Sequence, residues 1–151
     1  MHGLAFLVAV VSNPRRLMGS AIVSKDVLMC DDEVHILRAA EFKVARAGYS
    51  VRMANDGQEA WEMIEQSLPD LLVTDLQMPR VDGLELVRRI RENELTRSLP
   101  ILMLTAKGFE LDREEMMHRW GVLDVLTKPF SPRELVHLID EVLGVAPVAA
   151  T

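Results

Sequence analysis

Two spacings of hydrophobic residues alternate along this chain from residue 26 onward. Short and nearly continuous apolar runs are typical of strands that are buried on both faces of a parallel sheet. In the stretches between them, apolar residues recur every three or four positions, as in amphipathic helices. The runs predict strands over residues 27–30, 49–54, 71–74, 101–104 and 122–126. The stretches between and after them predict helices over residues 33–47, 58–67, 84–93, 109–120 and 132–143.

Residues with known helix-capping preferences stand at the expected ends. Gly48 follows the first predicted helix, where a left-handed glycine is favoured. Asp56 precedes the second, and Ser131 with Glu134 precedes the last in the spacing of a capping box. In the helix over residues 84–93 we expect one face to be buried and the arginines to be solvated. The expected inward residues are Leu84, Val87 and Ile90, and the expected outward ones are Arg88, Arg89 and Arg91.

The alternation of strand and helix predicts an α/β fold with right-handed crossovers. Five strands and five helices of this kind form a doubly wound, three-layer α/β/α sandwich with a parallel sheet. A length of 151 residues favours a single domain. We therefore expect one folded unit over residues 26–144, an N-terminal extension of uncertain status over residues 1–25, and a short tail over residues 145–151.

Composition limits the possible partners. The net charge of −6 does not favour a basic surface for phosphate backbones, so we expect no direct binding of nucleic acid. The longest apolar run, residues 4–11, is far shorter than the roughly 20 residues that span a membrane. The single cysteine, Cys30, requires no oxidising compartment and is expected to be a small buried hydrophobe. These features predict a cytoplasmic protein without a membrane segment.

Polar side chains follow four of the predicted strands. Asp31 and Asp32 follow the first, Asp75 the third, Thr105 the fourth and Lys128 the fifth. Since the carboxyl ends of parallel strands share one edge of the sheet, where ligands bind, we expect these groups to converge. Clustered carboxylates repel one another unless a cation neutralises them, and Mg²⁺ prefers oxygen ligands. With a lysine and a hydroxyl beside it, an aspartate can act as nucleophile in phosphoryl transfer.

The motifs that hold these residues resemble those of two-component response-regulator receiver domains of the chemotaxis type. They are residues 27–33 (VLMCDDE), 70–79 (DLLVTDLQMP), 82–83 (DG), 104–106 (LTA) and 126–130 (LTKPF). The resemblance extends over residues 26–144. It implies a flavodoxin-like fold with strand order 2-1-3-4-5.

The resemblance also implies roles for the polar residues. Asp75 would be the phosphoacceptor, and the cofactor would be Mg²⁺. Asp32, Asp75 and the backbone carbonyl of Gln77 would bind Mg²⁺ directly, and Asp31 would act through water. Lys128 would contact the phosphoryl group and precede a cis proline, and Thr105 would move toward that group.

The function implied is that of a phosphoacceptor in two-component signal transduction, or phosphorelay, and not that of an enzyme. A sensor histidine kinase or a histidine phosphotransfer protein would supply the phosphoryl group, and phosphorylation would switch the binding of an unknown output protein. We expect a stand-alone receiver that is a monomer or a weak, phosphorylation-dependent dimer.

Three positions bear on how the switch would be read out and how long it would last. Val125 stands where the family usually has an aromatic residue that turns inward on activation, so the readout of the switch is open. Gln77 and Lys107 would flank the path of the hydrolytic water, which leaves the phosphorylated lifetime open.

Other classes of protein compete with this interpretation. An aspartate-nucleophile phosphatase for small molecules usually has a second Asp two residues after the nucleophile, where this chain has Gln77. A flavodoxin-like mononucleotide binder needs a phosphate-binding first loop, but Asp31 and Asp32 would repel phosphate there. A degenerate receiver that is never phosphorylated would not need the full acidic set.

Overall fold

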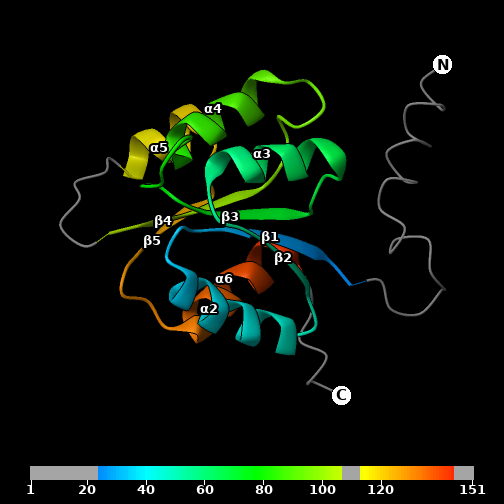
Figure 1. Cartoon of the computed structure of the whole chain (residues 1–151), viewed down its shortest axis with the longest axis vertical. Coiled ribbons are helices and arrows are strands. Elements are labelled where there is room, and N and C mark those ends of the chain that lie inside the picture. The colour runs from blue at the N-terminus through cyan, green and yellow to red at the C-terminus, as the bar shows by residue number, and fades with distance from the viewer. Residues whose placement is uncertain (1–23, 107–112, 145–151) are drawn as a thin grey trace.

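Five parallel strands form a single sheet with helices on both faces, in a computed structural model that describes residues 24–106 and 113–144 (Figure 1). The strands are β1 (Asp26–Cys30), β2 (Ser50–Ala54), β3 (Leu71–Asp75), β4 (Ile101–Thr105) and β5 (Asp124–Thr127). The helices are α2 (Val34–Arg46), α3 (Gly57–Gln66), α4 (Gly83–Glu92), α5 (Arg113–Trp120) and α6 (Pro132–Leu143). The strand order β2-β1-β3-β4-β5 confirms the predicted doubly wound fold and its flavodoxin-like order.

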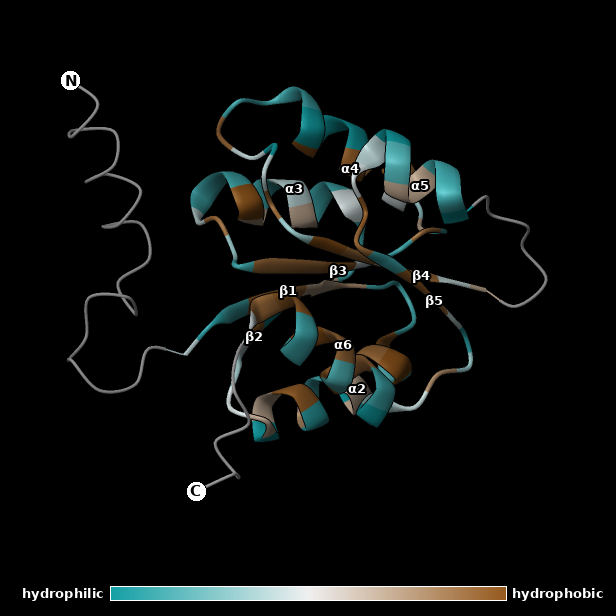
Figure 2. Cartoon of the chain, turned by 180° about the vertical axis from the view of Figure 1, so that it is seen from behind, coloured by the Kyte–Doolittle hydropathy of each residue, from teal (hydrophilic) through white to brown (hydrophobic). Residues whose placement is uncertain are grey.

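The sheet separates two hydrophobic clusters. Helices α3, α4 and α5 cover one face and α2 and α6 cover the other (Figures 1 and 2). Along β1, Leu28 and Cys30 pack into the first cluster, whereas Val27 and Met29 pack into the second. Alternate residues of a strand thus pack against the helices on opposite faces of the sheet. Because both faces are covered, the central strands are apolar at almost every position.

The predicted caps are present at the helix ends. Gly48 adopts a positive φ of 104° just after α2. The Asp56 carboxylate accepts a hydrogen bond from the Glu59 N–H at 2.8 Å. Ser131 and Glu134 form the reciprocal capping box at the start of α6. These local signals fix where the helices begin and end.

Apart from the start of β5, each predicted boundary within the described residues agrees with the structure to within one residue. Helix α5 begins at Arg113, and the first residues of the predicted helix, 109–112, lie outside the described residues. Strand β5 begins at Asp124 and not at residue 122. Val122 is nevertheless buried in the cluster under α3, α4 and α5. Its apolar side chain therefore indicates a buried position, although that position is not in a strand.

The predicted inward face of α4 is partly wrong. Leu84 is 37% exposed, and Leu86 is the fully buried leucine of this helix. The helix begins at Gly83, and Asp82 caps it by accepting a hydrogen bond from the Glu85 N–H at 2.8 Å. The buried stripe of α4 consists of Gly83, Leu86, Val87 and Ile90.

The prediction that Arg91 lies on a solvated face is wrong. Its guanidinium donates hydrogen bonds to four backbone carbonyls at the ends of neighbouring segments. The acceptors are the carbonyl oxygens of Trp120 (2.7 Å), Arg97 (2.8 Å), Leu99 (2.8 Å) and Gly121 (3.1 Å). Arg91 therefore joins α4 to the loop before β4 and to the turn after α5.

Most of the predicted N-terminal extension (residues 1–23) and the tail (residues 145–151) lie outside the described residues. Within the described part of the chain, no helix is both long enough and apolar enough to cross a membrane.

Candidate functional site

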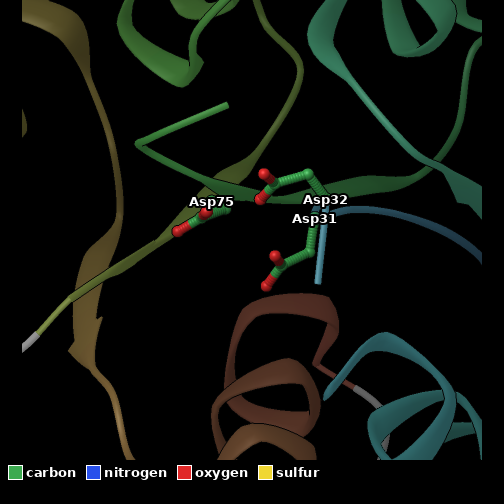
Figure 3. A group of neighbouring side chains, drawn as sticks. All are labelled: Asp31, Asp32 and Asp75. Carbon is green, nitrogen blue, oxygen red and sulfur yellow. The ribbon is translucent and has the colours of Figure 1, made fainter. Parts of the chain in front are cut away.

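Three aspartates meet at the carboxyl edge of the sheet. Asp31 and Asp32 follow β1, and Asp75 ends β3 (Figure 3). The parallel register places Cys30 beside Thr74, so the next residues, Asp31 and Asp75, emerge side by side. One carboxylate oxygen of each aspartate lies within 4.8 Å of the others. Asp31 and Asp75 are 1% and 4% exposed, whereas Asp32 is open to solvent.

Lys128 reaches this acidic cluster from the end of β5. Its backbone N–H donates to the carbonyl of Thr105 at 2.7 Å, which aligns it with the end of β4. The Lys128 ammonium Nζ lies 2.8 Å from Asp31 Oδ2 and 3.4 Å from Asp75 Oδ1. The Lys128–Pro129 peptide bond is cis, as expected. The structure thus brings Lys128 and the three aspartates together, as the sequence predicted.

The electrostatics of the cluster leave the Asp75 carboxylate poorly stabilised. The pKa of Asp75 is raised to about 6, chiefly by burial and also by the neighbouring charge of Asp31, while Lys128 acts in the opposite direction. Burial disfavours the charged form of Lys128, but its carboxylate partners outweigh that effect and hold its pKa above the usual range. Lys128 therefore stays charged, and two buried aspartates share its charge.

Two buried oxygens at this edge have no hydrogen bond among the described residues: Asp31 Oδ2 and Thr105 Oγ1. The 2.8 Å contact of Asp31 Oδ2 with Lys128 is an ion pair that lacks hydrogen-bond geometry. A buried hydroxyl without a hydrogen bond costs free energy, so Thr105 Oγ1 is poised to bond to a further group. The all-oxygen donor set of Asp31, Asp32 and Asp75 fits a hard divalent cation such as Mg²⁺.

The loop after β3 is held against the site by close contacts. A Cβ on Gly83 would lie 2.2 Å from the carbonyl oxygen of Asp75, so only glycine fits there. Arg80, at a positive φ of 65°, pairs with Asp56 at 2.7 Å and ties this loop to the start of α3. We did not predict either contact, although the Asp82–Gly83 motif was a signal for the glycine.

Glu33, which also follows the first strand, is a further residue at the site for which no role was predicted from the sequence. Its Oε1 lies 2.9 Å from Lys128 Nζ. The hydrogen bond from Lys128 and its charge hold the pKa of Glu33 below the usual range. Glu33 lies next to the predicted aspartate pair, but its spacing alone does not show that its side chain turns toward Lys128.

The remaining predicted positions lie around this cluster. Gln77 is exposed, two residues beyond Asp75. Val125 is half-buried beside Met103 in the neighbouring strand and packs against the cluster under α3, α4 and α5. Lys107 lies outside the described residues.

A parallel sheet of this order with an acidic pocket at its carboxyl edge is the architecture of receivers in two-component signalling. The sequence pattern of the response regulator receiver domain matches residues 27–140. The chain therefore belongs to the family of response regulator receiver domains.

Similar proteins include transcriptional regulators and receivers of known structure. The chain is 39% identical over 128 residues to the alkaline phosphatase synthesis transcriptional regulatory protein PhoP of Bacillus subtilis, covering 85% of this chain and 52% of PhoP. It is 42% identical over 122 residues to the phosphate regulon transcriptional regulatory protein PhoB of Pseudomonas aeruginosa, covering 81% of this chain and 53% of PhoB. The chain thus spans about half the length of these two relatives.

Two solved structures show the same arrangement of the chain. The receiver domain of the Francisella response regulator 1452 aligns with a TM-score of 0.73 at 30% identity, covering 80% of this chain and 98% of that one. The chemotaxis response regulator CheY4 of Vibrio cholerae aligns with a TM-score of 0.71 at 29% identity, covering 79% and 98%.

Proposed function

We propose that residues 26–144 form a receiver that accepts a phosphoryl group on Asp75 in a Mg²⁺-dependent reaction. A sensor histidine kinase or a histidine phosphotransfer protein would supply that group, and its arrival would switch the binding of a partner protein. The observation that carries the proposal is the position of the Asp75 carboxylate, which is 4% exposed and lies 3.4 Å from Lys128 in a cluster of carboxylates. The proposal concerns this receiver unit, acting as a signalling phosphoacceptor and not as an enzyme.

The three aspartates and a backbone carbonyl would hold the metal ion. Asp32 and Asp75 would bind it directly together with the carbonyl of Gln77, and Asp31 would act through water. When bound, Mg²⁺ neutralises the carboxylates and the phosphoryl oxygens. The raised pKa of Asp75 and the ion pairs of both Asp31 and Asp75 with the single ammonium of Lys128 support this assignment, because two buried negative charges share one positive charge.

In the transfer step a carboxylate oxygen of Asp75 attacks the phosphorus atom. A phosphorus–oxygen bond forms to Asp75, and the phosphorus–nitrogen bond of the donor phosphohistidine breaks, so that its electron pair returns to the imidazole. Lys128 neutralises charge on the phosphoryl oxygens. No proton has to leave Asp75, provided that its carboxylate is ionised.

The switch would follow from the new charge on Asp75. The phosphoryl oxygens would attract the Thr105 hydroxyl, which has no hydrogen-bond partner among the described residues. Movement of Thr105 at the end of β4 would alter the face that extends from β4 to the fifth helix, α6. Since Val125 is not aromatic, this change would be transmitted by Thr105 and the neighbouring loops.

Acetyl phosphate with Mg²⁺ tests the proposal. Intact-mass spectrometry of the wild-type chain should show the gain of one phosphoryl group, and the gain should disappear when Mg²⁺ is chelated. Asp75→Asn should show no gain. Asp70→Asn is the matched control, because Asp70 lies just before the other end of β3, where it accepts a hydrogen bond from the Asp26 N–H at 2.7 Å. A full gain in Asp75→Asn would overturn the assignment, and sustained turnover of a phosphomonoester would favour a phosphatase.

A further inference from the structure

Three carboxylates surround Lys128, and that of Glu33 is the most exposed of them. We propose that Glu33, whose carboxylate contacts Lys128 Nζ in the resting protein, sets the phosphodonor preference of the receiver by disfavouring doubly charged small donors. This inference rests on the proposed role of Asp75 as the phosphoacceptor.

Three carboxylates surround the Lys128 ammonium, and the contact with Glu33 is the hydrogen bond among them. The Lys128 Nζ lies 2.8 Å from Asp31, 2.9 Å from Glu33 and 3.4 Å from Asp75. An ammonium group has three N–H donors, and Glu33 engages one of them in the resting protein. A phosphoryl oxygen that approaches Lys128 from the exposed side therefore competes with the Glu33 carboxylate.

Glu33 is the partner that can leave. The Asp31 side chain is 1% exposed and the Asp75 side chain 6% exposed, whereas that of Glu33 is 46% exposed. Solvent can take up the Glu33 carboxylate at little cost, while withdrawal of either aspartate would leave a buried charge without its counter-charge. Entry of the phosphoryl group would thus begin by displacing Glu33 from Lys128.

The backbone keeps Glu33 near the entrance of the pocket. Glu33 is the N-cap residue of α2, and its N–H donates to Asp31 Oδ1 at 2.9 Å. Its side chain can rotate away from Lys128, but its charge remains close to the path of the donor. Repulsion between two charges scales with the charge of each. A dianionic donor therefore experiences about twice the repulsion of a singly charged donor.

The test compares two small donors at saturating Mg²⁺. Acetyl phosphate is a dianion near neutral pH, whereas phosphoramidate carries a single net negative charge. Glu33→Gln keeps the shape of the side chain and removes its charge. It should raise the second-order rate constant of phosphorylation by acetyl phosphate about three- to tenfold, and that by phosphoramidate by about the square root of that factor. The gain should shrink at about 0.5 M salt, because salt screens exposed charges.

Two further variants keep the test specific. Glu41→Gln makes the same charge change eight residues further along α2, about 12 Å away by helical rise, and should leave both rate constants unchanged. Glu33→Ser, a residue favoured at an N-cap, should reproduce the donor-dependent gain if Glu33→Gln folds poorly.

The outcomes separate this inference from the proposed function. Equal changes for the two donors, or no change for either, would overturn the role of Glu33 while Asp75 remains the acceptor. A wild-type chain that takes up no phosphoryl group from either donor would overturn the proposed function itself.

Discussion

Gly83 lies directly against the backbone of Asp75. A Cβ at position 83 would stand 2.2 Å from the Asp75 carbonyl oxygen and 2.8 Å from the Leu76 Cα. Helix α4 therefore begins so close to the end of β3 that position 83 has no room for a side chain. The contact fixes the loop that follows Asp75.

Gly83→Ala should consequently damage both stability and phosphorylation. Because backbone atoms must move to admit the methyl group, we expect the free energy of unfolding to fall by about 1–3 kcal/mol. We also expect slower phosphorylation by acetyl phosphate. Urea unfolding and intact-mass kinetics measure the two effects.

Gly144→Ala is the control for this prediction. Gly144 has a φ of 61° but no atom within 4 Å of the added Cβ, so only backbone strain of about 1 kcal/mol is expected. Phosphorylation should be normal. If Gly83→Ala behaves no worse than Gly144→Ala, the close approach does not constrain the site.

The buried charge of Asp75 predicts a dependence of stability on pH. Its pKa is about 6 in the folded protein against 3.8 ordinarily, so the folded state binds more protons between these values. The favourable contribution of Asp75 is complete below pH 3.8 and is lost as the pH rises through 6. In chelator, Asp75→Asn should therefore be about 1–3 kcal/mol more stable than the wild type at pH 7, and the difference should vanish near pH 4.

Asp56→Asn should behave in the opposite way. The N–H of Glu59 and the guanidinium of Arg80 hold the pKa of Asp56 below its usual range. Its contribution is therefore present at neutral pH and lost on acidification. Urea unfolding across the pH range measures both variants, and a stability difference for Asp75→Asn that does not change with pH would contradict the raised pKa.

Thr105→Val tests the unpaired hydroxyl. Valine has the same shape and removes a buried oxygen that has no hydrogen bond, so the resting protein should unfold at the same free energy or about 1 kcal/mol higher. The same variant should gain less stability than the wild type from Mg²⁺ with beryllofluoride, a phosphoryl mimic, if the hydroxyl binds that group. Thermal unfolding with and without the mimic measures both effects.

Thr74→Val provides the contrast. The hydroxyl of Thr74 is buried and donates to the Asp75 carbonyl at 3.0 Å, so its removal should lower the stability of the resting protein by about 1 kcal/mol. Equal stability losses for the two threonine variants would mean that the Thr105 hydroxyl is already satisfied.

Arg91 should be the arginine of α4 whose replacement costs the most stability. Lysine keeps the positive charge but cannot direct donors at four carbonyls, so Arg91→Lys should lower the free energy of unfolding by about 2 kcal/mol. Arg88→Lys, at an exposed position paired with Glu85 and Glu92, should leave the urea midpoint unchanged. Similar losses for both variants would contradict the anchoring role of Arg91.

The fold was predictable because its signals are local. Apolar runs, helical spacing and caps such as Asp56 and Ser131 each depend on neighbouring residues. The convergence of Asp31, Asp75 and Lys128 followed from a single further step, since parallel strands end at one edge.

The missed contacts depend on segments that meet only in the folded chain. Arg91 stands in the same polar stretch as Arg88 and Arg89. Its spacing does not show that its guanidinium donates hydrogen bonds to the carbonyls of Leu99 and Gly121. Leu84 and Leu86 both follow a helical period, and only the packing of α4 on the sheet shows that Leu86 is the buried one. The pairing of Glu33 with Lys128 likewise depends on side-chain orientation.

The two hydrophobic clusters on opposite faces of the sheet have a consequence for how the protein can vary. Val27 and Leu28 are neighbours in the chain, yet each packs with different helices. Substitutions in separate clusters share few partners, so their effects on stability should be close to additive. The helices on either side of the sheet can thus vary in sequence independently of each other. The residues at the carboxyl edge of the sheet lie next to both layers, so substitutions there are constrained by both.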